Sequence, residues 1–400
     1  MIELIKAPAL SDKDIQALCD YRLARIRAEM SRQGVSLCVL NNPVSLRYAI
    51  NFDEYQLFQS HIPTCYLFVP LEGPLVMHGA TGREWPNVQE YRRPDFLTPF
   101  DGGLDPERNS GRFAKAVLDF MAEHRLGEGG QAVALERFGP GVNQALRVQN
   151  LQLVDAECLL ERARLIKADI EIACMRHAVA VAEYGMQLMR QSMRPGITEN
   201  QLWSVLHQVN VAHGGNWIEG RMLSSGPRTN PWLQESSHRV IDAGDMVAFD
   251  TDMIGPMGYI ADISRSWICG GGAGTEQQRA AYRHAYDEIH HNMALIRPGI
   301  RFSELRDRAW QRAPQYQANR YVCSFHGAGL CDEYPKIYYA EDWAHSGYDG
   351  VVEENMVLCV ESYSGALGGD VGVKLEEMVR VTASGYERLT TYPFEQELLM

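Results

Sequence analysis

Long hydrophobic runs and an excess of basic charge are both missing from this sequence. No stretch reaches the roughly 18 consecutive apolar residues expected of a membrane-spanning helix, and the first fifteen residues lack the apolar segment of a secretory signal. The 38 Lys and Arg residues are outnumbered by 51 Asp and Glu residues, which gives a net charge of −13. Because nucleic acids and anionic membrane surfaces attract basic proteins, we expect neither as a partner.

Paired cysteine motifs, internal repeats and low-complexity segments are also missing. The nine cysteines are scattered and odd in number, with no C-x-x-C, a pattern typical of reduced thiols in a cytoplasmic protein. Disulfide frameworks and zinc knuckles are thereby disfavoured. What is present is ordinary for a globular chain: 400 residues, of which 46% are hydrophobic and 22% charged, which suggests two or three domains.

The first 160 residues alternate between helical and strand-like segments. Residues 12–34 carry apolar side chains at helical spacing and end on a glycine. The apolar segments near 35–40, 64–71 and 132–140 are typical of buried strands. We therefore predict a smaller α/β domain over residues 1–160, and it contains no cluster of catalytic residue types.

The remaining residues, 161–400, predict a second domain of α+β type. Asp169 is the expected N-cap of one helix, and Thr198 opens a capping box for the next. Strands dominate after that, interrupted by one long helical stretch near 275–318.

Three aspartates within a short stretch of this second domain point to a metal site. Asp250 and Asp252 are two residues apart on a predicted strand, so their side chains should leave the same face. A turn at 255–258 then returns the chain to Asp262 in antiparallel fashion. Carboxylates gathered between apolar strands repel one another unless they are protonated or held by a cation. A metal site therefore explains the pattern better than a solvent-exposed hairpin face does.

Three further groups extend this set of donors. His326 lies in the glycine-rich segment SFHGAGL, Glu361 ends the strand MVLCVES, and Glu376 lies in the strand GVKLEEMVRV. Together with the aspartates they make five carboxylates and one imidazole. Such an oxygen-rich set without thiolate suits Mn, Fe, Co or Zn and not copper. Two divalent ions would offset most of its negative charge, so we expect two metals per chain.

With these motifs in order, residues 160–400 resemble the creatinase/aminopeptidase P/methionine aminopeptidase superfamily, whose catalytic domain has the pita-bread fold. The resemblance implies a smaller creatinase-like N-terminal domain over 1–160, a pita-bread catalytic domain over 161–400 and a homodimer. The segment SSGPRTNP at 224–231 is a further match. The dinuclear metal ligands of the superfamily map onto Asp250, Asp262, His326, Glu361 and Glu376.

Departures from the peptidase pattern indicate a different reaction. Asp250 and Asp262 are twelve residues apart, whereas the peptidases separate them by eleven. The two histidines that handle the peptide are missing, and Glu333 stands seven residues after the ligand histidine, where one of them is expected. The Pro-Gly that follows the first ligand glutamate in peptidases is Ser362-Tyr363 here.

One branch of the superfamily, the metal-dependent dimethylsulfoniopropionate lyases of the DddP type, is similar in these details. The resemblance implies β-elimination to dimethyl sulfide and acrylate, with iron as the favoured metal and Mn, Co or Zn as alternatives. It adds Asp252 to the metal ligands, and the same lyases carry an aspartate at Asp332 as the general base. Two alternatives remain open: an Xaa-Pro peptidase or creatinase-like hydrolase that uses the same metals, and a non-enzymatic binding protein on the same scaffold.

Catalysis by elimination would require a general base and residues that bind the sulfonium group. Asp332 is the candidate base, and burial beside other carboxylates is expected to tune it toward that role. Tyr321 is the reserve candidate, able to orient the substrate or to carry the proton. The zwitterionic substrate bears a sulfonium cation, which aromatic faces attract. Trp217, Trp232 and Tyr321 flank the motifs as candidate substrate-binding residues, although each also suits core packing.

Overall fold

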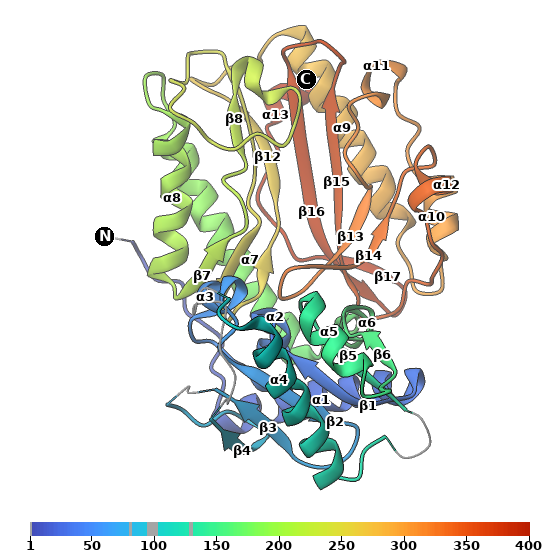
Figure 1. Cartoon of the computed structure of the whole chain (residues 1–400). Coiled ribbons are helices and arrows are strands. Elements are labelled where there is room, and N and C mark those ends of the chain that lie inside the picture. Colours follow the sequence, from blue (N-terminus) through green and yellow to red (C-terminus); the bar gives the residue numbers. More distant parts are fainter. Residues whose placement is uncertain (1, 80–81, 94–102, 128–130) are drawn as a thin grey trace. The chain divides into compact units, whose positions relative to one another are not determined.

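The computed structural model describes residues 2–79, 82–93, 103–127 and 131–400 (Figure 1). Its internal contacts form two compact units, one spanning Ala9–Arg164 and the other spanning Leu165–Met400 together with Met1–Pro8. Within the described ranges, no helix combines the length and apolar character needed to cross a bilayer.

The unit Ala9–Arg164 is built on one mixed sheet of six strands in the order β4-β3-β2-β1-β5-β6. Its strands are β1 (Val35–Leu40), β2 (Tyr66–Pro70), β3 (Leu75–His78), β4 (Val88–Arg92), β5 (Ala132–Leu135) and β6 (Leu153–Asp155). Its helices are α1 (Asp12–Gln33), α2 (Pro43–Ile50), α3 (Gln56–His61), α4 (Pro106–Glu123), α5 (Pro140–Arg147) and α6 (Glu157–Arg164). The predicted first helix is confirmed, and Gly34 ends it with a φ of 67°, a left-handed conformation that glycine adopts without steric cost.

Seven helices are described in the second unit. They are α7 (Asp169–Ser192), α8 (Glu199–Ala212), α9 (Glu276–Leu295), α10 (Phe302–Arg308), α11 (Pro314–Gln317), α12 (Trp343–Ser346) and α13 (Gln396–Leu399). Two expectations were wrong. Ala168, not Asp169, is the N-cap of α7, because Glu171 reaches back to its backbone N–H. The single helical stretch near 275–318 is three helices, since Pro298 and Pro314 cannot continue a helix.

The strands of this second unit form three antiparallel sheets. A five-stranded sheet has the order β14-β13-β15-β16-β17, and two three-stranded sheets have the orders β12-β9-β8 and β11-β10-β7. Their bounds are β7 (Gly215–Ile218), β8 (Leu223–Ser225), β9 (Met246–Asp250), β10 (Met253–Pro256), β11 (Ile260–Ala261), β12 (Ser264–Ile268), β13 (Phe325–Ala328), β14 (Asp332–Ile337), β15 (Val357–Gly365), β16 (Gly372–Thr382) and β17 (Gly385–Arg388).

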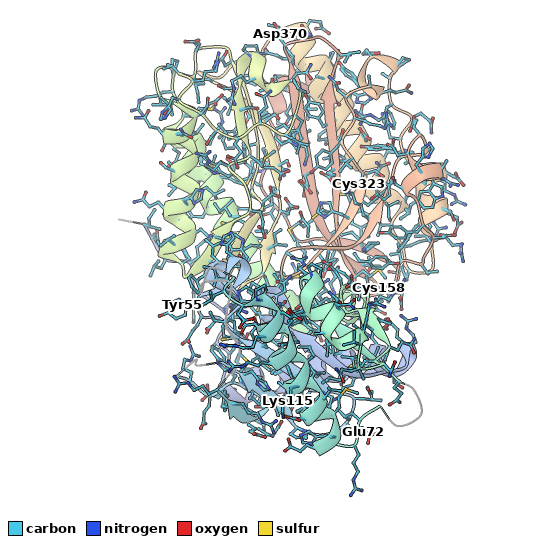
Figure 2. The ribbon with its side chains drawn as sticks, in the orientation of Figure 1. Tyr55, Glu72, Lys115, Cys158, Cys323 and Asp370 are labelled. Carbon is cyan, nitrogen blue, oxygen red and sulfur yellow. The ribbon has the colours of Figure 1, made fainter. Side chains whose placement is uncertain are left out.

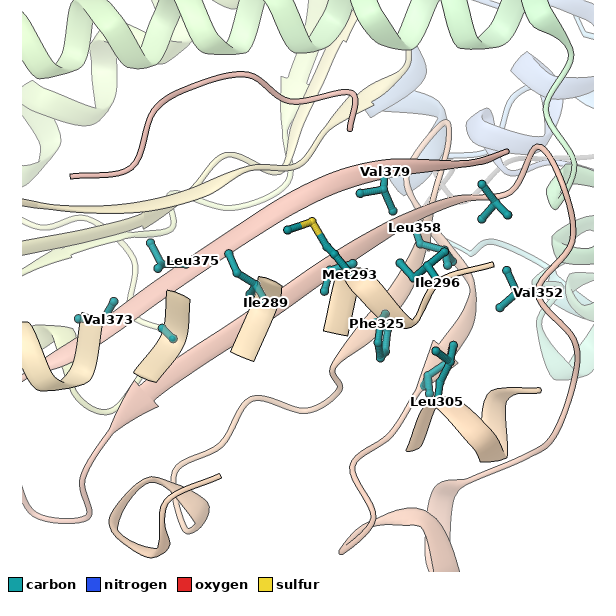
Figure 3. Packing of buried hydrophobic residues seen from close by; sticks show 14 of the residues in the cluster. Ile289, Met293, Ile296, Leu305, Phe325, Val352, Leu358, Val373, Leu375 and Val379 are labelled. Carbon is teal, nitrogen blue, oxygen red and sulfur yellow. The ribbon is translucent and has the colours of Figure 1, made fainter. Parts of the chain in front are cut away.

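The core of this unit lies between α9 and the five-stranded sheet (Figure 3). Ile289 and Met293 of α9 pack in one cluster with residues of β15 and β16 such as Leu358 and Leu375. Side chains alternate between the two faces of a strand. The polar residues next to these positions, among them Glu361 and Glu376, therefore point to the opposite face of the sheet.

Candidate metal centre

A hairpin brings the three predicted aspartates together. β9 ends at Asp250, whose Cα partner on β12 is Ser264, and β10 and β11 form the turn between them. The expectation that Asp252 continues the same strand was wrong, because the strand stops at Asp250 and Asp252 has a φ of 36°. This left-handed backbone, uncommon for a residue other than glycine, leaves a carboxylate oxygen of Asp252 within 4.8 Å of donor atoms of Asp250 and Asp262.

The five-stranded sheet supplies the other predicted donors. Glu361 and Glu376 are direct Cα partners in the β15–β16 ladder, so both carboxylates leave the same face side by side. His326 lies on β13, next to β15, and its Nε2 is 3.2 Å from Glu376 Oε1. The same Nε2 is 3.5 Å from Asp262 Oδ2 and 3.5 Å from Glu361 Oε1.

Six side chains predicted from the sequence as ligands thus lie in one cluster, and they form overlapping groups with donor atoms close enough to share an ion. The three groups are Asp262–His326–Cys359–Glu376, Asp250–Glu361–Glu376 and Asp250–Asp252–Asp262. Asp250 Oδ1 and Asp262 Oδ1 are buried and find no hydrogen-bond partner among the described residues. Buried oxygens without a donor are costly, so the cluster suits cations.

Lys374 is a member of this site that the sequence analysis missed. Its fully buried ammonium lies 2.8 Å from Asp250 Oδ2, from Glu361 Oε2 and from Glu376 Oε2. These three carboxylates form one of the three candidate groups, and the Lys374 ammonium already occupies the place that an ion would take among them. Two groups remain, and they share Asp262. The five carboxylates and Lys374 carry a formal charge of −4, which two divalent ions would cancel.

The electrostatics of the metal-free cluster agree with this count. Burial and the charge of Glu376 raise the pKa of Asp250, and burial with the surrounding carboxylates raises the pKa of Asp262 well above its ordinary range. Burial also raises the pKa of Glu361 to about 7, although the nearby Lys374 opposes the shift. Although burial opposes it, contacts with Lys374 and His326 lower the pKa of Glu376. Without metals, burial and mutual repulsion thus favour the protonated forms of Asp250, Asp262 and Glu361.

Two thiols that the sequence analysis did not consider also lie beside the cluster. Cys359 Sγ is 3.7 Å from Asp262 Oδ2, and Cys323 donates to Glu361 Oε1 at 3.3 Å. Cys323 lies just before β13 (Figure 2). Strand alternation could have identified Cys359, since it precedes Glu361 by two residues on one strand. The same rule links Lys374 to Glu376.

Asp332, the predicted base, begins β14 and lies beside the imidazole. Its Oδ1 is 3.8 Å from His326 Nδ1, and its side chain is 57% exposed. The expected burial of Asp332 was wrong, because the residue directly follows the turn at residues 329–331 that joins β13 to β14.

Glu333, which stands where peptidases place a histidine, is instead buried and paired with Lys167. Its Oε2 lies 2.9 Å from Lys167 Nζ, and its Oε1 accepts a hydrogen bond from the backbone of Leu330 at 3.0 Å. Both side chains of the ion pair are at most 3% exposed. Glu333 therefore holds the turn that precedes Asp332.

A cavity of about 500 Å³ has Trp232 and Tyr321 among its lining residues, whereas Asp332 and the six predicted ligands are not among them. The Lys374 ammonium lies 4.8 Å from the Tyr321 ring centroid and 5.8 Å from that of Trp232. Tyr363, also missed from the sequence, packs on Trp232 with centroids 5.8 Å apart. The charge of Glu361, with burial, raises the pKa of Tyr321, which keeps its phenol protonated.

Trp217 does not belong to this aromatic wall. It lies on β7, where its Cα partner is Ile254 of β10, and it is not among the residues that line the cavity. Of the three aromatic residues proposed to bind substrate, the cavity thus contains Trp232 and Tyr321 only.

Comparison with known proteins identifies relatives over most of the chain. Dimethylsulfoniopropionate lyase DddP of Roseovarius nubinhibens is 36% identical over 396 residues, covering 96% of this chain and 88% of the relative. Dimethylsulfoniopropionate lyase DddP of Roseobacter denitrificans is 34% identical with the same coverage. Both sequence identities are higher than those expected of proteins that share only a fold.

Solved structures agree on the architecture. An Xaa-Pro dipeptidase from Bacillus anthracis superposes with a TM-score of 0.75 at 20% identity, covering 94% of this chain and 99% of the dipeptidase. The predicted creatinase-type pita-bread fold is thereby confirmed. Metallopeptidase family M24 matches residues 173–383, more than half of the chain. The chain belongs to metallopeptidase family M24, in which it is a DddP-type protein.

Proposed function

We propose that the protein is a metal-dependent carbon–sulfur lyase that cleaves dimethylsulfoniopropionate to dimethyl sulfide and acrylate. The observation that carries the proposal is an acidic and imidazole cluster whose buried Lys374 lies against Trp232 and Tyr321, two aromatic residues that line a cavity. The histidines that handle the peptide in the peptidases are missing from this sequence. The relatives that are 36% and 34% identical are named for this reaction. Residues 161–400 would form the catalytic domain.

The residues present suit two divalent ions, held by Asp250, Asp252 and Asp262 on one side and by Asp262, His326, Glu361 and Glu376 on the other. When bound, such ions supply Lewis-acid stabilisation of the charge that develops on the substrate carboxylate. The preference for iron and the homodimeric state follow from the resemblance to DddP-type lyases alone.

The elimination itself needs a base and a leaving group. Asp332 would take the proton from the carbon next to the substrate carboxylate, and that electron pair would form the double bond of acrylate. The C–S bond breaks and its electrons leave with sulfur as neutral dimethyl sulfide, so no general acid is required. Trp232 and Tyr321 would face the sulfonium, and the Tyr321 phenol would orient the substrate.

A direct assay separates this proposal from its main rival, an Xaa-Pro hydrolase, which the fold neighbour favours. The protein is stripped with chelator, reloaded with Fe, Mn, Co or Zn, and given either dimethylsulfoniopropionate or an Xaa-Pro dipeptide. We expect dimethyl sulfide from reloaded protein, none from chelated protein, and no proline. Asp262→Ala should abolish the reaction, whereas Asp370→Asn, at the tip of the β15–β16 hairpin (Figure 2), should not. Proline release without dimethyl sulfide would reverse the assignment.

A further inference from the structure

We propose that Cys359 supplies a sulfur donor to the ion held by Asp262, His326 and Glu376, which makes this position of the centre selective for thiophilic metals. The inference rests on the proposed metal centre and adds a ligand of a different chemical class to it. It predicts tighter binding of Zn²⁺, Co²⁺ and Cd²⁺ than an all-oxygen and imidazole site would give.

The β-sheet register brings Cys359 to the site. Its Cα partner on β13 is His326, and directly paired residues in antiparallel strands hold their Cβ atoms roughly 4.5–5.5 Å apart. Glu361 follows two residues later on β15, so the thiol and this carboxylate share one face. Cys359 is completely buried, as are most of its neighbours in the cluster. Its position is therefore set by main-chain pairing and not by a flexible loop.

The distances between donor atoms match the edges of a metal-centred tetrahedron. Metal bonds of about 2.0–2.3 Å to nitrogen, oxygen and sulfur give edges of about 3.3–3.8 Å. His326 Nε2 is 3.2 Å from Glu376 Oε1 and 3.5 Å from Asp262 Oδ2, which in turn is 3.7 Å from Cys359 Sγ. A second, independent feature points to a ligand here, since Asp262 Oδ1 is buried without a hydrogen-bond partner among the described residues.

Glu361 need not be displaced for sulfur to bind. Its Oε1 is 3.5 Å from His326 Nε2, while its Oε2 is held by Lys374 at 2.8 Å. Five-coordinate arrangements occur in zinc sites, so Cys359 and Glu361 can both contribute. Cys323 provides a matched control, because its thiol contacts Glu361 at 3.3 Å yet belongs to none of the candidate groups.

Cobalt spectroscopy tests the sulfur donor directly. Wild type, Cys359→Ser and Cys323→Ser are stripped, loaded with Co²⁺ to the same measured content, and scanned in the near ultraviolet for sulfur-to-cobalt charge transfer. We expect the band in wild type and Cys323→Ser and its loss in Cys359→Ser. The Cys359→Ser change should also weaken Cd²⁺ binding by at least roughly tenfold, the loss that even outer partners of a metal cause, and leave Mn²⁺ binding nearly unchanged.

A measurement on unmodified protein covers the case in which Cys359→Ser does not fold. X-ray absorption of the zinc-loaded wild type should reveal a sulfur scatterer at about 2.3 Å. Absence of that scatterer, absence of the cobalt band in wild type, or its persistence in Cys359→Ser would overturn the proposal. Dimethyl sulfide release by the same samples distinguishes the two ideas. Activity without a sulfur signal overturns the donor alone, whereas failure to bind cobalt overturns the donor and the metal centre together.

Discussion

Asp332, the candidate base, lies beside the imidazole of His326, and 57% of its side chain is exposed. We expect Asp332→Asn to lower the turnover number by about 10²–10⁴-fold, the usual contribution of a general base. Metal content should be unchanged. Turnover and elemental analysis of the same samples check this. Near wild-type turnover in Asp332→Asn, with a loss in Tyr321→Phe, would transfer the role to Tyr321.

Trp232 is the aromatic residue best placed to recognise a sulfonium. It lines the cavity and already lies 5.8 Å from one buried cation, Lys374. Cation–π attraction is worth roughly 0.5–2 kcal/mol, so Trp232→Leu should raise the KM for the sulfonium about 2- to 30-fold. Steady-state kinetics of Trp232→Leu and Trp217→Leu give the comparison. A larger increase in KM for Trp217→Leu than for Trp232→Leu would contradict binding of the sulfonium beside Trp232.

At the scale of single elements, the hairpin between β9 and β12 carries the extra residue that distinguishes this chain from the peptidases. Asp252 occupies the bend with a φ of 36°. Asp252→Asn preserves a residue type that tolerates this backbone but removes the charge. We expect it to lower the metal content toward one ion per chain and to abolish most activity, as Asp252→Ala should. Two bound metals in both variants would show that Asp252 is not a ligand.

The turn before β14 depends on a buried ion pair between Lys167, which precedes α7, and Glu333. Removing one partner leaves an uncompensated buried charge, which typically costs roughly 3–5 kcal/mol. Lys167→Met should therefore reduce the free energy of unfolding by about that amount. The double variant Lys167→Met/Glu333→Leu should regain much of it, because neither charge remains. Denaturant unfolding of the wild type and the two variants decides, and a double variant no more stable than Lys167→Met would refute the explanation.

These elements also show which features of the site could be predicted from the sequence. The strand periods predicted the hairpin and both glutamate strands, whereas the full ligand set, His326 included, came from the resemblance to the superfamily. They could not predict the bend at Asp252 or the exposure of Asp332, which depend on loop geometry. Nor could they predict that Glu333 pairs with Lys167, because the partner is 166 residues away in the chain. Strand alternation could have predicted Cys359 and Lys374, because it places them on the same face as Glu361 and Glu376.

At the scale of the whole molecule, the buried carboxyl groups predict an unusual response of the metal-free protein to pH. The pKa of Glu361 rises from its ordinary 4.5 to about 7, so the folded state binds more protons than the unfolded state between these values. The stability from this group is complete at low pH and is lost as pH rises through the window. Asp250 and Asp262 shift in the same direction.

Bound metals should reverse this loss of stability with rising pH, because they bind the deprotonated carboxylates. In chelator, we expect Tm to fall between about pH 5 and about pH 7.5. Adding metal should raise Tm much more at the higher pH. Thermal unfolding across this range, with and without metal, provides the measurement. A chelated protein that becomes more stable as pH rises through this window would contradict the protonation of the cluster.

The ladder between β15 and β16 has a consequence for how the protein acquires its ions. Glu361 and Glu376 are the middle pair of nine consecutive Cα partners, so main-chain hydrogen bonds fix their spacing before any metal arrives. Lys374, also on β16, holds Asp250, Glu361 and Glu376 together, because its ammonium lies 2.8 Å from an oxygen of each. We therefore expect that metal ions can leave the site and bind again without refolding of the chain. We also expect the bound ion to depend both on the metals that the finished protein meets and on the donors that the cluster offers them.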